Sequence, residues 1–335
     1  MSTPKTADGP TVDGLTPDGP TVDRRAADGL TADGPTSDGP TVDRRAADGL
    51  TVDGPTADEQ TAHGQRVDDL TDLTDLTVRE NTAAATRQAA AAAIDAQGTD
   101  EAEWQEARLP DHLPRLVLPA GPVVVVAAHP DDEVLGFGGT IAALLQAGVE
   151  VHTVCLSDGE ASHGPGTPSA RARLAARRRA ELSAALRELG ELPDPVYAGL
   201  PDTALDRPEH ESEARAIIGE LLGAVGAALC VAPWEGDLHS DHEAAGRAAR
   251  HAGRAGSTPV WSYPVWMWHW ARPHDPRVPW HRAAVLPLPE PVTDRKKAAL
   301  ARFSSQLEPR GAGIAPVLPT AEIAHHTRAF ETVIR

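Results

Sequence analysis

The sequence VVVVAAHPDDE at residues 123–133 determines how the chain folds. Its first five residues are apolar and mostly β-branched, which predicts a strand that is buried on both faces of a parallel sheet. Polar residues begin where the apolar run stops, and apolar residues then recur at helical spacing over Asp132–Ala147. A buried strand that leads through a short polar turn into a helix is the basic unit of a parallel α/β domain.

The alternation of strand and helix continues along the chain to Ala252. The strands expected are Val123–Ala128, Val149–Leu156, Val196–Ala198 and Leu229–Ala232. The helices expected after the first one are Ala170–Leu189, Glu211–Val225 and Asp241–Ala252. Right-handed crossovers place the carboxyl ends of parallel strands at one edge, where open α/β sheets bind ligands. We therefore expect a Rossmann-like layered α/β fold with a mostly parallel sheet over residues 120–335.

A perfect internal repeat precedes this domain. The stretch Asp18–Thr31 recurs letter for letter as Asp38–Thr51, and aspartate falls at every fifth position from Asp8 to Asp58. No face of this segment is apolar enough to bury a core, so ordering it would cost conformational entropy with little return. We expect residues 1–78 to form a disordered acidic tail. It is either a solubilising or docking segment or an insertion without a function.

Residues 79–119 are expected to form a helical lead-in and a linker. The alanine-rich run Asn81–Gln97 favours a helix that ends at Gly98. A second helix is expected over Asp100–Arg108, with Trp104 as its anchor. The prolines that mark the linker are Pro110, Pro114 and Pro119.

Composition excludes several classes of protein. The net charge is −18, and no basic cluster is present to bind the phosphates of a nucleic acid. Cys155 and Cys230 are too few for a disulfide scaffold and lie in apolar runs, which favours a reducing compartment. No apolar segment is long enough to cross a bilayer, and none near Met1 is typical of a secretory signal peptide. We expect a cytoplasmic protein without a membrane span.

Two polar segments follow strands that should end at the same edge of the sheet. The first is AHPDDE at residues 128–133, and the second is WEGDLHSDH at residues 234–242. His129 and Asp132 are three residues apart on a turn from strand to helix, so both side chains can face one point, and His242 would join them from the second segment. Two imidazoles and a carboxylate are ligands that zinc accepts, and catalytic zinc sites commonly have three protein ligands. We therefore expect one Zn²⁺ per chain.

A helix N-terminus is the alternative interpretation of the first segment. Pro130 and the acidic residues that follow it are favoured in the first turn of a helix. That interpretation does not account for histidines that two strands bring to one edge. The glycines of the segment Gly136–Thr140 lie inside the helix, so they are expected to allow close helix–sheet packing and not to bind phosphate.

These segments resemble the PIG-L / LmbE-like family of zinc-dependent N-acetylglucosaminyl deacetylases. The resemblance rests on AHPDDE after the strand and on the later HSDH, and it covers about residues 120–307. It extends to Arg178 and Glu181 in an R-x-x-E helix, to the GLPD segment that ends at Asp202, and to a late SQ motif at Gln306. The family often has histidine two residues before the serine of that last motif, where this chain has Phe303.

The chemistry implied is amide hydrolysis. Asp131 lies next to the expected ligands and is the candidate general base, which the resemblance also implies. His239 is expected to donate a hydrogen bond to the tetrahedral oxyanion in its protonated form, so the pH profile should be bell-shaped. Asp241 could hold one imidazole in the tautomer that its role requires. The resemblance further implies that Arg178 and Asp202 bind the sugar, although a solvated helix face is the alternative for Arg178.

Tryptophans are concentrated in one short segment, Trp261–Trp270. Trp266, Trp268 and Trp270 alternate, so a strand would place them on one face. They could stack on a sugar or an acyl chain, pack against a helix, or contact a partner subunit in a homo-oligomer. His269 is expected to be a satisfied histidine and not a metal ligand.

The function expected is that of a metal-dependent N-deacetylase. Its substrate would be a small-molecule glycoconjugate, namely an N-acetylglucosaminyl compound. The enzyme would remove the N-acyl group, and acetyl is the group we expect. The alternatives left open are an amidase that acts on a larger thiol-sugar conjugate and a non-catalytic sugar-binding protein with the same fold. The hypothesis of a nucleotide-binding reductase is disfavoured, because no glycine-rich turn directly follows the first strand.

Deletion of residues 1–78 is expected to leave turnover unchanged, because the repeat contributes no residue to the predicted site. Steady-state turnover of the truncated and the full-length chain, each loaded with metal, checks this expectation. A lower turnover number for the truncated chain would contradict it.

Overall fold

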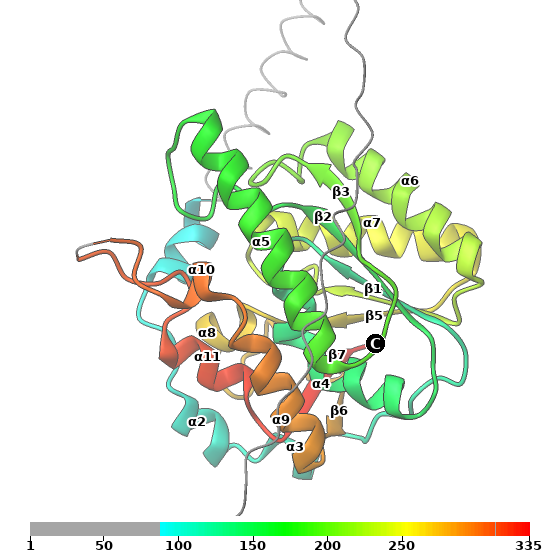
Figure 1. Ribbon diagram of the computed structural model, residues 1–335. Coiled ribbons are helices and arrows are strands. Elements are labelled where there is room, and N and C mark those ends of the chain that lie inside the picture. Colours follow the sequence, from blue (N-terminus) through cyan, green and yellow to red (C-terminus); the bar gives the residue numbers. More distant parts are fainter. Residues whose placement is uncertain (1–87, 312) are drawn as a thin grey trace, which may run out of the picture. The chain divides into compact units, whose positions relative to one another are not determined.

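The computed structural model describes residues 88–311 and 313–335 (Figure 1). The acidic repeat tail expected over residues 1–78 lies outside them. The described residues contain a seven-stranded sheet with the order β3-β2-β1-β4-β5-β7-β6. Its strands are β1 (Val123–Ala127), β2 (Val151–Ser157), β3 (Val196–Leu200), β4 (Leu229–Pro233), β5 (Val260–Tyr263), β6 (Ala283–Pro287) and β7 (Phe330–Ile334).

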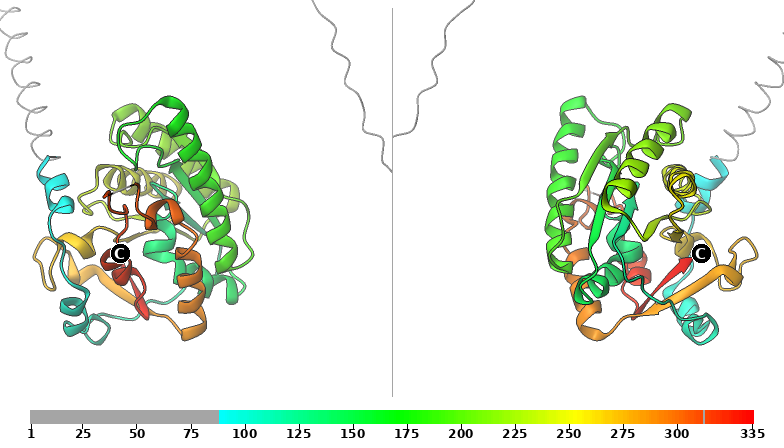
Figure 2. Two further views of the ribbon diagram at one scale, coloured as in Figure 1. Left: turned by 60° about the vertical axis from the view of Figure 1, so that its left-hand side comes forward. Right: turned by 90° about the vertical axis from the view of Figure 1, so that its right-hand side faces the viewer.

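Helices cover both faces of the sheet (Figure 2). One face packs on α4 (Asp132–Gln146), α5 (Pro168–Leu189) and α9 (Glu290–Leu300). The other face packs on α6 (Pro208–Val225) and α7 (Ser240–Gly256). The shorter helices are α2 (Glu101–Glu106), α3 (Leu109–His112), α8 (Met267–Trp270), the 3-10 turn η1 (Trp280–Arg282), α10 (Ser304–Leu307) and α11 (Thr320–His326).

Strand β1 has no polar face, as its sequence predicts. Val123, Val125 and Ala127 pack into the core beneath α4 and α5, whereas Val124 and Val126 pack into the core beneath α6 and α7. β1 pairs in parallel with β2 on one side and with β4 on the other. It is therefore the central strand, and its burial on both faces explains why a run of β-branched residues is needed there.

The predicted layered α/β fold is confirmed. The strands and helices expected between residues 123 and 252 agree with those observed to within about one helical turn. β7 extends the sheet beyond β5 and runs antiparallel to both β5 and β6, so the sheet is mostly and not wholly parallel. The glycines inside α4 serve close packing, because a Cβ on Gly136 would lie 2.1 Å from the Tyr263 ring.

The lead-in packs on the domain through Trp104. Residues 88–95 are helical, and α2 follows within the predicted range. Trp104 is 2% exposed, and its indole Nε1 donates to the carbonyl oxygen of Trp268 at 2.8 Å. Its role as an anchor is confirmed. Pro110 lies in the first turn of α3 and not in a linker, because proline is tolerated where a helix begins.

The expectation that Trp266, Trp268 and Trp270 share one face of a strand is wrong. Residues Met267–Trp270 form the short helix α8, and the three side chains do not all pack in one place. Trp268 packs edge-on against Trp104, with ring centroids 5.0 Å apart, and Trp270 stacks on Trp234 at 6.3 Å. Trp268 and Trp270 therefore pack in one apolar cluster with Trp104 and Trp234, whereas Trp266 packs against the core beneath α4 and α5.

Both cysteines and His269 have the environments that the sequence predicts. Cys155 and Cys230 are both buried free thiols. His269 is bonded to Glu322 at 2.9 Å and to the carbonyl oxygen of Ala96 at 3.0 Å, so it is a satisfied histidine. No helix within residues 88–311 and 313–335 has the length and apolar character needed to cross a membrane.

A buried ion pair fixes the middle of α4. Lys296 Nζ lies 2.6 Å from Glu331 Oε1, and both side chains are almost fully buried. Lys296 also donates to the carbonyl oxygen of Leu135 at 2.8 Å, while Glu331 accepts from the backbone nitrogens of Gly139 and Thr140 at 2.7 Å each. Burial lowers the pKa of Lys296, but the carboxylate beside it opposes that shift.

The change Lys296→Met is expected to lower the free energy of unfolding by about 3 kcal/mol, because it leaves a buried carboxylate without its counter-charge. Its neighbour Lys297, which is 53% exposed and 3.8 Å from Asp294, offers a matched control. Lys297→Met should change the free energy of unfolding by no more than about 0.5 kcal/mol. Urea unfolding of the three proteins measures both values, and equal stability of the two variants would contradict the assignment.

Candidate metal centre

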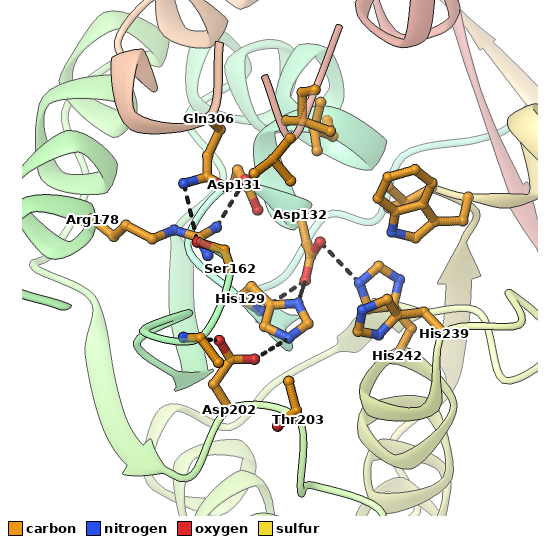
Figure 3. A pocket seen from close by; sticks show the side chains of 16 residues that line it. His129, Asp131, Asp132, Ser162, Arg178, Asp202, Thr203, His239, His242 and Gln306 are labelled. Carbon is orange, nitrogen blue, oxygen red and sulfur yellow. Dashed lines mark hydrogen bonds and ion pairs between the residues drawn. The ribbon is translucent and has the colours of Figure 1, made fainter. Parts of the chain in front are cut away.

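Two loops meet at the carboxyl ends of β1 and β4, which are neighbouring strands (Figure 3). The turn after β1 carries His129 and Asp131, and Asp132 begins α4. The loop after β4 leads to His239, which directly precedes α7, and Asp241 and His242 lie in the first turn of that helix. After β1 the chain adds β2 and β3 on one side of that strand, and β4 then pairs on its other side. The strand order therefore reverses between β1 and β4, and open α/β sheets bind ligands at such a point.

The carboxylate of Asp132 lies between two imidazoles. Its Oδ1 is 3.1 Å from His242 Nε2, and its Oδ2 is 3.5 Å from His129 Nδ1. All three side chains are nearly buried. The three residues that the sequence predicts as metal ligands are therefore brought together by the fold.

Each of these imidazoles has its other ring nitrogen held by further carboxylates. His242 Nδ1 is 2.7 Å from Asp237 Oδ2. His129 Nε2 is 3.1 Å from Asp241 Oδ2 and 3.2 Å from Asp202 Oδ1. Carboxylates commonly orient metal-bound histidines in this way, leaving the remaining nitrogen for the ion.

The site has the donor chemistry of a cation site. Potential ligand atoms of His129, His239 and His242 lie within 4.8 Å of one another, as do those of His129, Asp202 and Asp241. Burial acts to lower the pKa of His242, but Asp132 and Asp237 outweigh it and raise that pKa to about 9. Carboxylates likewise raise the pKa of His129 well above its usual value. A field that favours protons on these imidazoles also favours a divalent cation between them.

Asp131 is held in an unusual conformation beside this cluster. Its backbone has a φ of 156° and a ψ of −27°, which residues other than glycine rarely adopt. Arg178 Nη2 donates to Asp131 Oδ2 at 2.9 Å and to the carbonyl oxygen of Pro130 at 3.1 Å. Burial is the main influence on the Asp131 carboxyl and raises its pKa to about 6, although the Arg178 guanidinium opposes the shift.

Arg178 is thus no part of a solvated helix face. Its side chain is 3% exposed, and it crosses from α5 to the loop before α4, where Nη1 also donates to the carbonyl oxygen of Gly159 at 3.0 Å. Arg178 and Asp202, the two residues that the resemblance assigns to sugar binding, both line the same cavity as the histidines.

The imidazole of His239 lies beside the rings of His129 and His242. Its centroid is 4.5 Å from that of His242 and 5.0 Å from that of His129. Burial, together with the charges of these two neighbours, lowers the pKa of His239 to about 3. This low pKa favours the neutral imidazole near pH 7, in contrast to the protonated form expected from the sequence. A neutral imidazole can still donate one N–H.

Asp241 acts on a different histidine from those beside it in the sequence. Its carboxylate contacts His129, from the other loop, and accepts hydrogen bonds from the backbone nitrogens of Thr203 at 2.8 Å and Leu205 at 3.0 Å. It therefore ties three segments together. The residue that holds His242 is Asp237, to which the sequence analysis assigned no role.

Asp237 is a residue of the site to which sequence reasoning gave no role. Its carboxylate is fully buried and also accepts from three successive backbone nitrogens, those of Val265 at 3.1 Å, Trp266 at 2.9 Å and Met267 at 2.8 Å. These bonds start α8 and thereby explain why the tryptophan segment is not a strand. The sequence indicates this role only weakly: Asp237 follows a buried strand and precedes His242 by five residues.

The cavity has a volume of about 210 Å³ and is lined by both polar and apolar side chains. The polar side chains of the cavity include Arg178, Asp202, Ser162 and Gln306. The apolar residues that line it are Leu135, Val265, Trp266, Val317 and Leu318. Trp266 is thus the member of the tryptophan segment that reaches the cavity, and Gln306 is a further lining residue that the sequence analysis left without a role.

Comparisons with known proteins agree with this arrangement of motifs. Over 133 residues the chain is 35% identical to the probable N-acetyl-alpha-D-glucosaminyl L-malate deacetylase 2 of Bacillus anthracis, which covers 39% of this chain and 58% of that protein. Over 120 residues it is 34% identical to the 1D-myo-inositol 2-acetamido-2-deoxy-alpha-D-glucopyranoside deacetylase of Mycobacterium avium (strain 104), covering 31% and 40%. The chain therefore spans less than two thirds of the length of these curated relatives.

Two solved structures are also similar. The conserved protein TT1542 from Thermus thermophilus has 29% identity and a TM-score of 0.42, covering 55% of this chain and 79% of that chain. The A40926 pseudoaglycone deacetylase Dbv21 has 20% identity and a TM-score of 0.48, covering 63% and 95%. The family model described as PIG-L, GlcNAc-PI de-N-acetylase, matches residues 124–253. The chain therefore contains a PIG-L domain at residues 124–253.

Proposed function

We propose that this protein is a metal-dependent N-deacetylase that hydrolyses the N-acyl group, in the first place acetyl, of an N-acetylglucosaminyl conjugate. The observation that carries the proposal is the pair of imidazoles that share one carboxylate, each held from behind by a second carboxylate, with Asp131 beside them. The relatives, which are named as deacetylases of glucosaminyl malate and glucosaminyl inositol compounds, support the same substrate class.

In this proposal His129, Asp132 and His242 hold one Zn²⁺ per chain. Two imidazoles and a carboxylate match the protein ligands of catalytic zinc sites, in which a further position stays open. A bound zinc ion supplies Lewis acidity, which activates water and polarises the amide carbonyl. Asp241 holds His129 through Nε2, so that Nδ1 is the nitrogen left for the ion.

Asp131 is the proposed general base. Its carboxylate would take a proton from the attacking water and pass it to the amine that leaves, and burial brings its pKa close to neutrality, where a base of this kind works best. His239, as a neutral donor, would give a hydrogen bond to the carbonyl oxygen as negative charge develops there. Arg178 orients Asp131, and with Asp202 it lines the cavity, where the sugar would bind.

The first experiment measures metal content and then acetate release from a panel of N-acetylglucosaminides. About one zinc per chain together with acetate release is the expected result. Zinc without acetate release would favour the amidase with a larger conjugate, or the non-catalytic sugar-binding protein. Failure to bind a metal even after reconstitution would overturn the mechanism.

Asp131→Ala is expected to lower the turnover number by a factor of about 10²–10⁴, because the proton of the attacking water then lacks an acceptor. Metal content should stay close to that of the unchanged protein, since Asp131 is not a proposed ligand. Elemental analysis beside the kinetic assay checks both points, and loss of zinc would make Asp131 a ligand.

Asp237→Asn is expected to weaken zinc binding by about 10–100-fold. The amide oxygen can keep the bonds from the backbone nitrogens of Val265 and Met267, whereas the bond from Trp266 is lost. The NH₂ group would face His242 Nδ1 and favour the tautomer that carries its proton on Nε2. That tautomer blocks the nitrogen proposed to bind the ion. Competition with a chelator of known affinity measures the change, and circular dichroism shows whether α8 and the fold persist. Unchanged affinity in a folded variant would contradict this role.

A further inference from the structure

We propose that the side-chain oxygen of Gln306 is a substrate-binding atom that accepts a hydrogen bond from a hydroxyl group of the sugar. The inference deepens the proposed deacetylase function and rests on it. Gln306 lies in α10, far along the chain from both histidine motifs, and lines the cavity near Arg178 and Ser162 (Figure 3).

The orientation of the Gln306 amide is fixed by its neighbours. Ser305 Oγ lies 2.5 Å from Glu181 Oε2, to which it must donate because a carboxylate only accepts. Ser305 Oγ is therefore the acceptor for Gln306 Nε2 at 2.8 Å. The amide nitrogen also approaches Ser162 Oγ at 3.4 Å. The nitrogen end of the amide is thus assigned, and the other end must be the oxygen.

That oxygen lacks a hydrogen-bond partner among the described residues. Gln306 is fully buried, and its Oε1 has no hydrogen-bond donor within the part of the chain that the structure describes. A buried polar atom without a partner is costly, so such atoms are uncommon unless they serve a ligand. Gln306 also lines the cavity, so a molecule bound there could supply the donor that this buried oxygen lacks.

Glu181 is the residue that holds this arrangement in place. It is nearly buried and accepts from the backbone nitrogen of Ser305 at 2.8 Å, from Ser304 Oγ at 3.0 Å and from Arg177 Nε at 2.9 Å. Glu181 lies on α5 one turn after Arg178, so one helix positions both the partner of Asp131 and the support of Gln306. We describe Glu181 and Ser305 as positioning residues, since they act through Gln306.

A hydroxyl group fits this position better than an N–H group. Ser162 Oγ accepts from Gln306 Nε2, so its own hydrogen remains to be donated. An acceptor at Gln306 Oε1 and a donor at Ser162 can engage the hydrogen and the lone pair of one hydroxyl together. An N–H group could use only the acceptor. A sugar ring carries several hydroxyl groups, whereas the acyl group has none.

The test compares methyl N-acetylglucosaminide with its 3-deoxy, 4-deoxy and 6-deoxy analogues on the zinc-loaded full-length chain. One analogue should lose about 10–100-fold in kcat/KM against the unchanged protein. Gln306→Met, which keeps the length of the side chain but removes the acceptor, should lose a similar factor on the parent sugar. It should lose nothing further on that one analogue, because the bond is then already absent.

Two neighbouring serines offer matched variants. Ser305→Ala removes the acceptor that orients the Gln306 amide and should reproduce part of the loss on the parent sugar. Ser304→Ala removes a hydroxyl that donates to the same Glu181 but is not hydrogen-bonded to Gln306, and kcat/KM should stay close to that of the unchanged protein. Thermal unfolding of all variants shows that they are folded.

Several outcomes would overturn the inference, and they differ from a failure of the proposed function. If acetate is released but every analogue loses the same factor with Gln306→Met as with the unchanged protein, Gln306 has only a structural role. If the sugars bind without acetate release, the deacetylase function fails, and the same comparison made in Kd by calorimetry decides the role of Gln306. If the parent sugar neither binds nor reacts, both proposals are wrong.

Discussion

The parallel pairing of β1 with β4 is the constraint on which the candidate site depends. Residues Val123, Val124 and Val125 pair with Leu229, Cys230 and Val231, so the loops that follow both strands leave the sheet side by side. Through this register, His129 and His242 come within reach of one carboxylate although more than a hundred residues separate them. A shift of this register by one residue would also exchange the two faces of β1, both of which are buried and apolar.

Burial of so many charged groups is the main energetic problem of the site. Asp132, Asp202, Asp237 and Asp241 are all nearly inaccessible to solvent. The structure offsets this with imidazoles and with backbone N–H groups, of which Asp237 receives three and Asp241 two. A charge that is buried without such partners is strongly destabilising. The acidic residues around the histidines are therefore also the residues that fix the loops of the domain to each other.

The sequence predicted most of the central sheet and the meeting of the two histidine motifs, because both follow from the alternation of buried strands and amphipathic helices. It did not predict which carboxylate faces which imidazole. Asp241 is adjacent to His242 in sequence but contacts His129, whereas Asp237, five residues before His242, holds that imidazole, since helix and loop geometry decide the direction of a side chain. The sequence does not predict the helix α8, because its start is fixed by backbone N–H groups that donate to Asp237, and alternating tryptophans do not indicate these bonds. The low pKa of His239 depends on burial and on the charges of two neighbouring imidazoles, which spacing along the chain does not give.

The packing of Trp104 has a consequence for where the folded unit begins. The matched domain starts at residue 124, yet Trp104 and Leu109 are buried against Trp268, Met267 and Val278 in a separate apolar cluster. A chain cut back to the start of the match would uncover the indole surface of Trp268 and the apolar residues around it. Exposed apolar patches of this kind promote self-association. The natural boundary for expressing the domain therefore lies before Thr99, whose hydroxyl donates to the carbonyl oxygen of Ala271, and not at the first strand of the sheet.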